Sequence, residues 1–439
     1  MTKNSTTYES RINTITLANG FKAFLLPVSG CKTISLGLCL LDVSESIADN
    51  SMVETIATMT GEMLFKGSKN YSCSSVADKL DEMCLSGLKF NGKAESLKLG
   101  ATIVASDLST FLAITLDALT NPGFDSSELA ILKNQYTGYV LSQKSDTGML
   151  SGIALAQKLY PKSSRYYMTD PDTDINCLSQ LEASHMHKYL KCMLNGQQRF
   201  IVMVGDFDTA DVTKLLDTTL GKLPANEYSI VCHSNQTQEQ DKFIAEAGNS
   251  ILKTLVEGKS STDIKIAFPL DIDRRDEDFE ACLVATNILG GDTLTSRLGK
   301  EVREKQGLTY GITANFIDAK FKYCPIAIEI TVNPNNVDKA LKSIDQVMQE
   351  FLRDGVTPKE LETEVMSLVN GVSINLRTNR NVCRAIMRTI EQGLELSSLD
   401  LFQAKLKKLN VIDVNMAIKQ HFKPAYENCK VTSIAGSIE

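Results

Sequence analysis

The 439-residue sequence predicts an α+β fold of two homologous domains, each a mostly antiparallel sheet flanked by helices. Three observations support this fold class. The chain is too long for one hydrophobic core and fits two domains of about 200 residues each. Stretches with a period of two, typical of strands, alternate with amphipathic stretches typical of helices. The same order of elements recurs in both halves of the chain, which indicates two copies of one unit.

The first half opens with a predicted hairpin, in which two strands flank the turn Ala18-Asn19-Gly20. The other elements follow from hydrophobic periodicity and from helix start and stop signals. The predicted strands are 12–17, 21–27, 33–41, 88–94, 97–105 and 200–204. The predicted helices are 52–65, 76–85, 108–119, 127–143, 148–159, 178–194 and 210–220.

Residues 222–250 are polar and irregular, which is typical of a linker. We therefore predict an N-terminal domain of residues 1–221 and a C-terminal domain of residues 251–439. A helix that starts at Thr357 has Pro358 in its first turn and Glu360 in the position of a capping box. The remaining elements predicted in the second half are strands 263–270 and 322–332 and helices 276–289 and 337–353.

The stretch 288–316 carries the most information about function. Its pattern predicts a helix end, a two-glycine turn, a short amphipathic helix and, after Gly307, a strand. Arg303 and Tyr310 lie seven residues apart, at the end of that helix and the start of that strand. A guanidinium and a phenol held across one turn could bind one carbonyl oxygen together. The alternative is a surface arginine and an ordinary strand tyrosine.

Composition excludes several classes of function. The net charge is −7 and no run of five basic residues occurs, so we expect no nucleic-acid partner. No stretch approaches 18 consecutive apolar residues, so no membrane span is predicted. Eleven cysteines without a C-x-x-C pair indicate reduced thiols. Because no signal peptide is visible, we expect a cytoplasmic protein. The periplasm or an organelle is the alternative if a leader has been removed.

The run GGDTLTSRLGKEVREKQGLTYGI resembles the C-terminal-domain signature of the pitrilysin and mitochondrial processing peptidase family of zinc metallopeptidases, or inverzincins. Residues 330–370 resemble the helices of the same domain. The resemblance implies a clamshell assembled from four homologous domains, of which this chain supplies half. It also implies that Arg303 and Tyr310 contact the substrate near the scissile bond.

The resemblance places the family's zinc motif, H-x-x-E-H, at residues 58–62, directly before the run MLFKGS. Two histidines of that motif bind zinc and the glutamate activates water. This chain has Thr58, Gly61 and Glu62 at those positions, so both ligands and the base are missing. The position of the third ligand falls near Tyr139, which is not a carboxylate. We therefore expect this chain to bind no metal.

The other histidines offer no substitute site. His185 and His187 are two residues apart on a predicted helix and so point to different faces. His233 lies in the linker and His421 near the C-terminus. We interpret all four as surface or capping residues.

These inferences favour a non-catalytic, substrate-binding subunit of a heterodimeric zinc metalloendopeptidase. The resemblance implies a homologous, zinc-bearing partner, whose active site Arg303 and Tyr310 would complete for the hydrolysis of unfolded peptides. The chain would be inactive alone. One alternative is a purely structural or peptide-binding homologue without a proteolytic role. Another is a lone peptidase with unconventional ligands.

The resemblance also implies where peptides bind. Phe90, Asn91, Gly92, Lys93 and Ala94 resemble the family's edge strand, which pairs with an extended substrate. Backbone pairing would give affinity with little sequence specificity. The alternative is an ordinary strand with a glycine bulge at Gly92.

Overall fold

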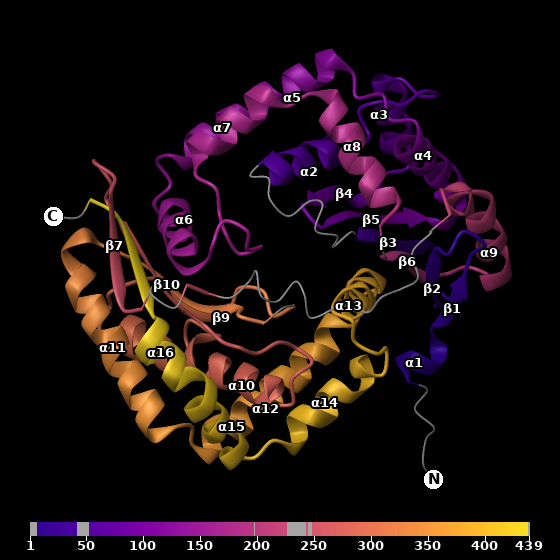
Figure 1. Ribbon diagram of the computed structural model, residues 1–439. Coiled ribbons are helices and arrows are strands. Elements are labelled where there is room, and N and C mark those ends of the chain that lie inside the picture. The colour runs from indigo at the N-terminus through magenta and orange to yellow at the C-terminus, as the bar shows by residue number, and fades with distance from the viewer. Residues whose placement is uncertain are drawn as a thin grey trace, which may run out of the picture. The chain divides into compact units, whose positions relative to one another are not determined.

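The computed structural model describes residues 7–41, 52–196, 198–225, 243–244, 248–320 and 322–437. The chain divides into two compact units (Figure 1). Unit 1 contains residues 1–139, 172–234 and 373–401, and unit 2 contains residues 140–171, 235–372 and 402–439. The predicted division at the linker puts segment 140–171 in the N-terminal domain and segment 373–401 in the C-terminal domain. In the structure the two segments are exchanged, because 140–171 belongs to unit 2 and 373–401 to unit 1. Most of the predicted linker lies outside the described residues.

Unit 1 is built on a six-stranded sheet with the order β1-β2-β6-β3-β5-β4. Only β2 and β6 pair in parallel among these neighbours, because the other four pairs are antiparallel. The strands are β1 (Asn13–Thr16), β2 (Lys22–Pro27), β3 (Thr33–Leu41), β4 (Ser86–Lys93), β5 (Ser96–Val104) and β6 (Gln198–Gly205).

Helices cover this sheet. Most belong to the N-terminal half of the chain: α1 (Tyr8–Arg11), α2 (Met52–Met63), α3 (Cys73–Glu82), α4 (Leu108–Thr120), α5 (Ser126–Gln143), α7 (Pro171–Gln180), α8 (Ala183–Leu194) and α9 (Thr209–Thr218). A further helix, α13 (Asn379–Glu391), comes from the exchanged segment and packs on β3 and β6. Gly37 of β3 makes room for it, because a Cβ there would lie 1.8 Å from Met387 Sδ.

Unit 2 repeats this plan with a five-stranded sheet of order β7-β11-β8-β10-β9. Only β7 and β11 pair in parallel among these neighbours. The strands are β7 (Ser250–Leu255), β8 (Thr262–Pro269), β9 (Ile312–Phe316), β10 (Pro325–Val332) and β11 (Val431–Gly436). The two sheets therefore confirm the predicted fold class, a mostly antiparallel sheet flanked by helices in each half.

The helices of unit 2 include two π-helical segments, η6 and η8. The elements are α6 (Thr147–Leu159), α10 (Phe279–Gly290), η6 (Gly299–Lys305), α11 (Val337–Asp354), α12 (Pro358–Asn375), α14 (Ser398–Lys408), α15 (Val411–Ala417), η8 (Ile418–Phe422) and α16 (Lys423–Cys429). The first residues of α14 belong to unit 1. Among the described residues, no helix is both long and apolar enough to cross a bilayer.

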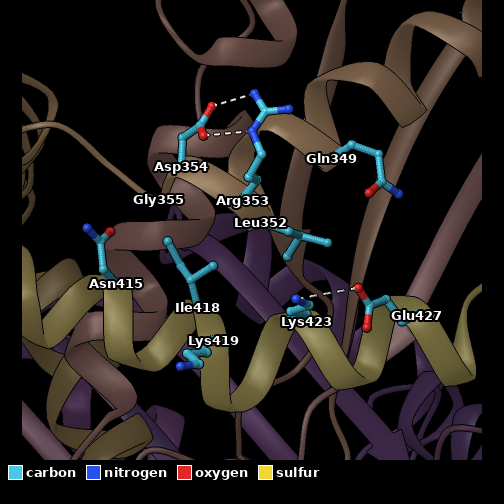
Figure 2. Close-up of a pocket in the computed structure, with 10 residues that line it drawn as sticks. All are labelled: Gln349, Leu352, Arg353, Asp354, Gly355, Asn415, Ile418, Lys419, Lys423 and Glu427. Carbon is cyan, nitrogen blue, oxygen red and sulfur yellow. Dashed lines mark hydrogen bonds and ion pairs between the residues drawn. The ribbon is translucent and has the colours of Figure 1, made fainter.

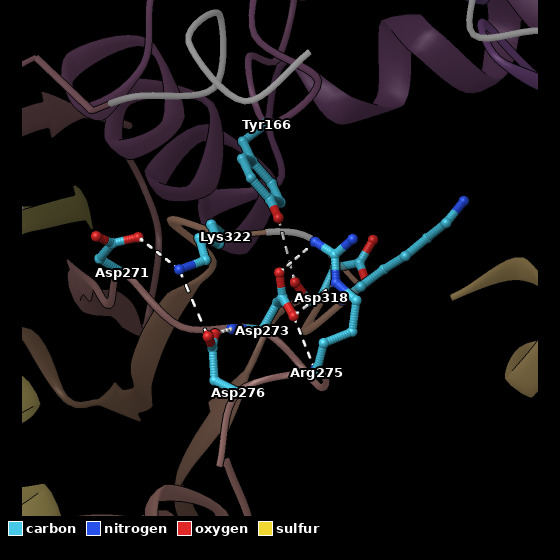
Figure 3. Close-up of polar contacts among 8 residues, drawn as sticks. Tyr166, Asp271, Asp273, Arg275, Asp276, Asp318 and Lys322 are labelled. Atoms are coloured by element: carbon cyan, nitrogen blue, oxygen red, sulfur yellow. Dashed lines mark hydrogen bonds and ion pairs between the residues drawn. The ribbon is translucent and has the colours of Figure 1, made fainter. Parts of the chain in front are cut away.

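The exchanged segment 140–171 is fixed to unit 2 by its helix and by two tyrosines. Helix α6 packs on β8 and β11. The Tyr160 hydroxyl donates to the Tyr323 carbonyl at 2.7 Å. The Tyr166 hydroxyl donates to the Asp318 carbonyl at 3.3 Å (Figure 3). Burial, together with the nearby Cys324 and Asp318, raises the pKa of Tyr166. Nonlocal contacts of this kind decide which unit contains the segment.

A second group of polar contacts orders the loop between β8 and α10. The carboxylate of Asp273, which is 1% exposed, accepts hydrogen bonds from Arg275 Nε at 3.0 Å and from Arg275 Nη2 at 2.6 Å (Figure 3). The Lys322 ammonium lies 3.5 Å from Asp276 and 3.8 Å from Asp271. Each cation therefore has carboxylate partners, and the cluster is structural.

One predicted helix differs from the structure, and strands β7 and β11 were not predicted. The helix predicted over 178–194 is two helices, because the chain leaves α7 after Gln180 and a capping box of Glu182 and His185 starts α8. Strand β7 is an edge strand whose alternation leaves Ile251 and Leu255 exposed, which masks its apolar signal in a polar region.

Candidate functional site

The functional stretch in unit 2 begins with a turn that leads from α10 into η6. Asp292 Oδ1 accepts the backbone N–H groups of Leu294 and Thr295, which starts a new helical turn. Leu298 and Val302 are fully buried in the core of unit 2. Segment η6 is π-helical, a rare wide turn that occurs often at functional sites. The predicted short amphipathic helix is present here in this wider form.

Arg297 anchors the start of η6. Its Nε and Nη2 donate to the two carboxylate oxygens of Glu360 at 2.7 and 2.8 Å, and Nη2 also reaches the Gly355 carbonyl. Partial burial opposes ionisation of Glu360, but hydrogen bonds from Arg297 and Thr357 outweigh it and lower its pKa to about 2. The ion pair therefore ties the base of η6 to the start of α12.

Arg303 and Tyr310 are brought together by one direct hydrogen bond. Gly307, with φ of +62°, makes the turn between them, and Arg303 Nε donates to the backbone carbonyl of Tyr310 at 2.8 Å. The Tyr310 side chain is 99% exposed, so its phenol makes no packing contribution to unit 2. Thr309 fixes the neighbouring backbone by donating to the Thr331 carbonyl. The arrangement leaves a phenol and part of a guanidinium available to a ligand.

The corresponding region of unit 1 is the face of α2 where the zinc motif is expected. Gly61 is buried against β4, where a Cβ would lie 3.0 Å from the Gly92 nitrogen. Thr58 is hydrogen-bonded to the phenol of Tyr136 on α5. Burial raises the pKa of Tyr136, and the nearby Asp174 adds to the effect. Glu62 is exposed.

These side chains do not fit a zinc ion. One carboxylate, a threonine and a glycine do not supply the three nitrogen, sulfur or carboxylate ligands that a catalytic zinc needs. Within the described ranges, no three His, Cys, Asp and Glu side chains gather to hold a metal. Tyr136, which sequence reasoning missed, lies on the side of α5 that faces Thr58. Its signal was its spacing of three residues from Tyr139, one helical turn.

The described histidines have structural roles. His185 Nδ1 accepts the backbone N–H of Glu182 in the capping box of α8. The ring of His187 packs edge-on against Phe124, with centroids 4.8 Å apart. His421 Nε2 lies 3.0 Å from Asp278. These contacts agree with the interpretation of capping or surface residues, and His233 lies outside the described residues.

The predicted peptide-binding strand is an edge strand. In the described sheet of unit 1, β4 pairs only with β5. Phe90 is 5% exposed and its ring packs on Phe65, so this side chain belongs to the core. Asn91 and Lys93 are exposed, whereas Ala94 follows the strand in the β4–β5 turn. Peptide binding at these residues stays a prediction.

Gly92 is needed for a close approach and not for a bulge. A Cβ at Gly92 would lie 1.8 Å from the Ala57 carbonyl oxygen, so α2 lies directly on β4 at this point. The irregularity in the β4–β5 register falls between Ser86 and Lys89 instead. The alternative of a bulge at Gly92 is therefore wrong.

A separate pocket of about 440 Å³ lies in unit 2 between the end of α11 and the helices η8 and α16 (Figure 2). Arg353 donates through Nε and Nη2 to the carboxylate of Asp354, and Lys423 Nζ lies 4.0 Å from Glu427 Oε1. The pocket contains none of the predicted site residues. Its charged side chains are largely paired with each other, so it carries no obvious ligand signal.

Comparisons with known proteins find similarity to an inactive peptidase domain and to a non-peptidase homolog. Residues 180–368 match the family model described as the peptidase M16 inactive domain. The non-peptidase homolog YmxG of Helicobacter pylori (strain ATCC 700392 / 26695) is 19% identical over 382 residues, which cover 86% of this chain and 83% of that protein.

Solved structures show the same fold. The peptidase M16 inactive domain from Pseudomonas fluorescens has a TM-score of 0.82 and 22% identity, and 97% of each chain is covered. The periplasmic protease PqqL from Escherichia coli has a TM-score of 0.78 and 14% identity, and the match covers 97% of this chain but 45% of that one. Residues 180–368 thus match a peptidase M16 inactive domain, the chain as a whole has the fold of these structures, and the zinc motif is absent at the position where the resemblance places it.

Proposed function

We propose that this chain is the non-catalytic, substrate-binding subunit of a heterodimeric zinc metalloendopeptidase. Its partner is a homologous subunit that carries the zinc, and their joint substrate is unfolded peptide. The observation that carries the proposal is Tyr310, whose phenol is 99% exposed on a backbone held by Arg303. Packing within unit 2 gives no reason for a tyrosine at this position.

Two further observations support the proposal. The face of α2 with Thr58, Gly61 and Glu62 does not fit zinc, so a peptidase containing this chain needs another source of metal. The protease PqqL, matched over 45% of its length, is long enough to hold a second portion of similar size. In our proposal, a separate chain supplies the equivalent of that second portion.

The chemistry assigned to this chain is binding and charge stabilisation. The Tyr310 hydroxyl donates a hydrogen bond to the oxyanion that develops on the scissile carbonyl. The terminal nitrogens of Arg303 hold a neighbouring substrate carbonyl, while Nε keeps its bond to the Tyr310 backbone. Both groups are useful only if a partner's active site faces them.

A purely structural or peptide-binding subunit is the second candidate. The hydrogen bond from Arg303 to the Tyr310 carbonyl favours it, because this bond gives Arg303 a role within the chain itself. The two candidates differ in whether the side chains of Arg303 and Tyr310 affect turnover.

The test is to co-express this chain with a zinc-bearing homologue and to measure peptide turnover at equal assembly. Tyr310→Phe removes one oxyanion donor, so turnover should fall about 10²–10³-fold. Arg303→Lys keeps the charge but loses the planar fork, so it should impair turnover too. The matched controls are Tyr167→Phe and Arg353→Lys in the same unit, which should leave turnover unchanged. Wild-type turnover in both site variants would favour the structural candidate.

A further inference from the structure

Helix α13 carries arginines at four-residue intervals, Arg380, Arg384 and Arg388. Residues four apart lie on one side of a helix, so the three guanidinium groups form a stripe. The opposite side of α13 is buried on the sheet of unit 1 through Val382 and Ile386. The stripe therefore lies on the flank and outer side of a helix whose position on the sheet is fixed.

Contacts at both ends of α13 show where this flank points. The Arg380 guanidinium lies over Gly87 of β4, because a Cβ there would be 1.8 Å from its Nη2. Near the other end, Glu391 receives Lys98 Nζ of β5 at 2.6 Å. Arg384 follows Arg380 by one turn on the same flank. The stripe thus runs beside the outer strands β5 and β4 of the sheet.

The side chains of β4 on this face follow from the register. Lys89 pairs with Gly100 of β5, which pairs with Gly37 of β3, and Gly37 is covered by Met387 of α13. Paired residues of neighbouring strands share a face. Lys89 therefore lies on the α13 face, opposite to the α2 face where Gly92 lies.

This face carries uncompensated positive charge. In the part of the chain that the structure describes, no carboxylate forms an ion pair with Arg380, Arg384, Arg388 or Lys89, whereas Lys98 is neutralised by Glu391. Arg384 and Arg388 are exposed, as is Lys89. A chain with a net charge of −7 thus presents a local cationic strip along its edge strand.

We propose that the peptides bound at β4 are acidic. A peptide added as a strand to β4 would place every second side chain on the α13 face, beside this strip. Asp or Glu at alternating positions would meet Lys89 and Arg384, and neutral or basic residues would leave these cations unpaired or repel them. The inference rests on the proposed peptide-binding function and adds its substrate class. A free strand edge selects peptide backbone over nucleic acid.

The test uses the purified full chain and fluorescence anisotropy with three labelled ten-residue peptides. They carry Glu, Gln or Lys at every second position and share Ser and Val between. At low salt the Glu peptide should bind about tenfold more tightly than the Gln peptide, and the Lys peptide most weakly. Salt at physiological strength should reduce the differences in affinity between the three peptides, because exposed charges are screened.

Arg384→Gln should weaken binding of the Glu peptide about 3–5-fold and leave the Gln peptide unchanged. The matched control is Arg11→Gln, an exposed arginine beside β1 at the other edge of the same sheet, which should change neither. Equal affinity for the Glu and Gln peptides would overturn the acidic class and leave the proposed function standing. Binding of no peptide would overturn peptide capture itself. A single-stranded oligonucleotide that binds more tightly than the Glu peptide would also overturn the inference.

Discussion

The face of α2 in unit 1 and segment η6 in unit 2 both lie where the resemblance predicts a functional site. They differ in whether their side chains are packed and hydrogen-bonded within the unit or exposed. On α2, Thr58 is bonded to Tyr136 and Gly61 is packed on Gly92. In unit 2, Tyr310 is 99% exposed, and Arg303 uses one nitrogen to fix the Tyr310 backbone.

The difference indicates that the α2 face stabilises the fold, whereas Arg303 and Tyr310 are available to bind a ligand. Most polar positions of the α2 face have been absorbed into packing and internal hydrogen bonds, so they contribute to stability and offer little to a ligand. Arg303 on η6 and Tyr310, which lies two residues before β9, contribute little to the fold beyond one hydrogen bond. Substitutions of the packed residues on the α2 face should therefore lower stability, and substitutions of Arg303 and Tyr310 should lower turnover.

The largest expected loss of stability is for Gly92→Ala. The added Cβ would lie 1.8 Å from the Ala57 carbonyl oxygen, and because this is backbone, α2 or β4 must move. We expect a loss of about 3 kcal/mol in the free energy of unfolding, measured by urea denaturation. Gly100→Ala on the neighbouring strand is the matched control, because nothing lies within 4 Å of its Cβ. Similar stability for both variants would show that α2 is not held tightly on β4.

A smaller effect is expected at Glu360, which supports η6 through Arg297. Its folded pKa of about 2 lies below the ordinary value of 4.5, so the carboxylate stabilises the fold above pH 4.5. This contribution should be lost as the pH falls from 4.5 towards 2. Glu360→Gln should cost about 2 kcal/mol at pH 7, and the two proteins should converge in stability near pH 2.

The matched control for this prediction is Glu362→Gln, an exposed glutamate on the same helix. Unfolding curves between pH 2 and pH 7 for the three proteins provide the measurement. If the stability of Glu360→Gln falls between pH 7 and pH 2 in the same way as that of the wild type, Arg297 and Glu360 do not anchor η6 in solution.

Sequence patterns predicted much of the fold, because strand and helix periods are local properties. Strand β3 matches its predicted bounds, and β4 and β5 lie within two residues of theirs. The exchange of the segments 140–171 and 373–401 could not be predicted, because it depends on nonlocal contacts such as that of Gly37 with Met387. The chain reads as two consecutive domains unless such contacts are known.

The candidate site divides in the same way. The spacing of seven residues, a local signal, allowed Arg303 and Tyr310 to lie together but left an ordinary surface arginine and strand tyrosine open, and only the resemblance assigned the two residues a shared role. The contact between Thr58 and Tyr136 joins two helices far apart in sequence, and it was missed. The arginine stripe of α13 has a visible four-residue period, but only the packing of α13 on unit 1 gives it a direction.

The most direct test of the account is to measure zinc and peptide cleavage for the isolated chain and for the chain paired with a zinc-bearing homologue. We expect no stoichiometric zinc and no cleavage for the isolated chain. We expect about one zinc per pair, with chelator-sensitive cleavage that neither subunit shows alone. About one zinc in the isolated chain, with chelator-sensitive cleavage of unfolded peptides, would contradict it.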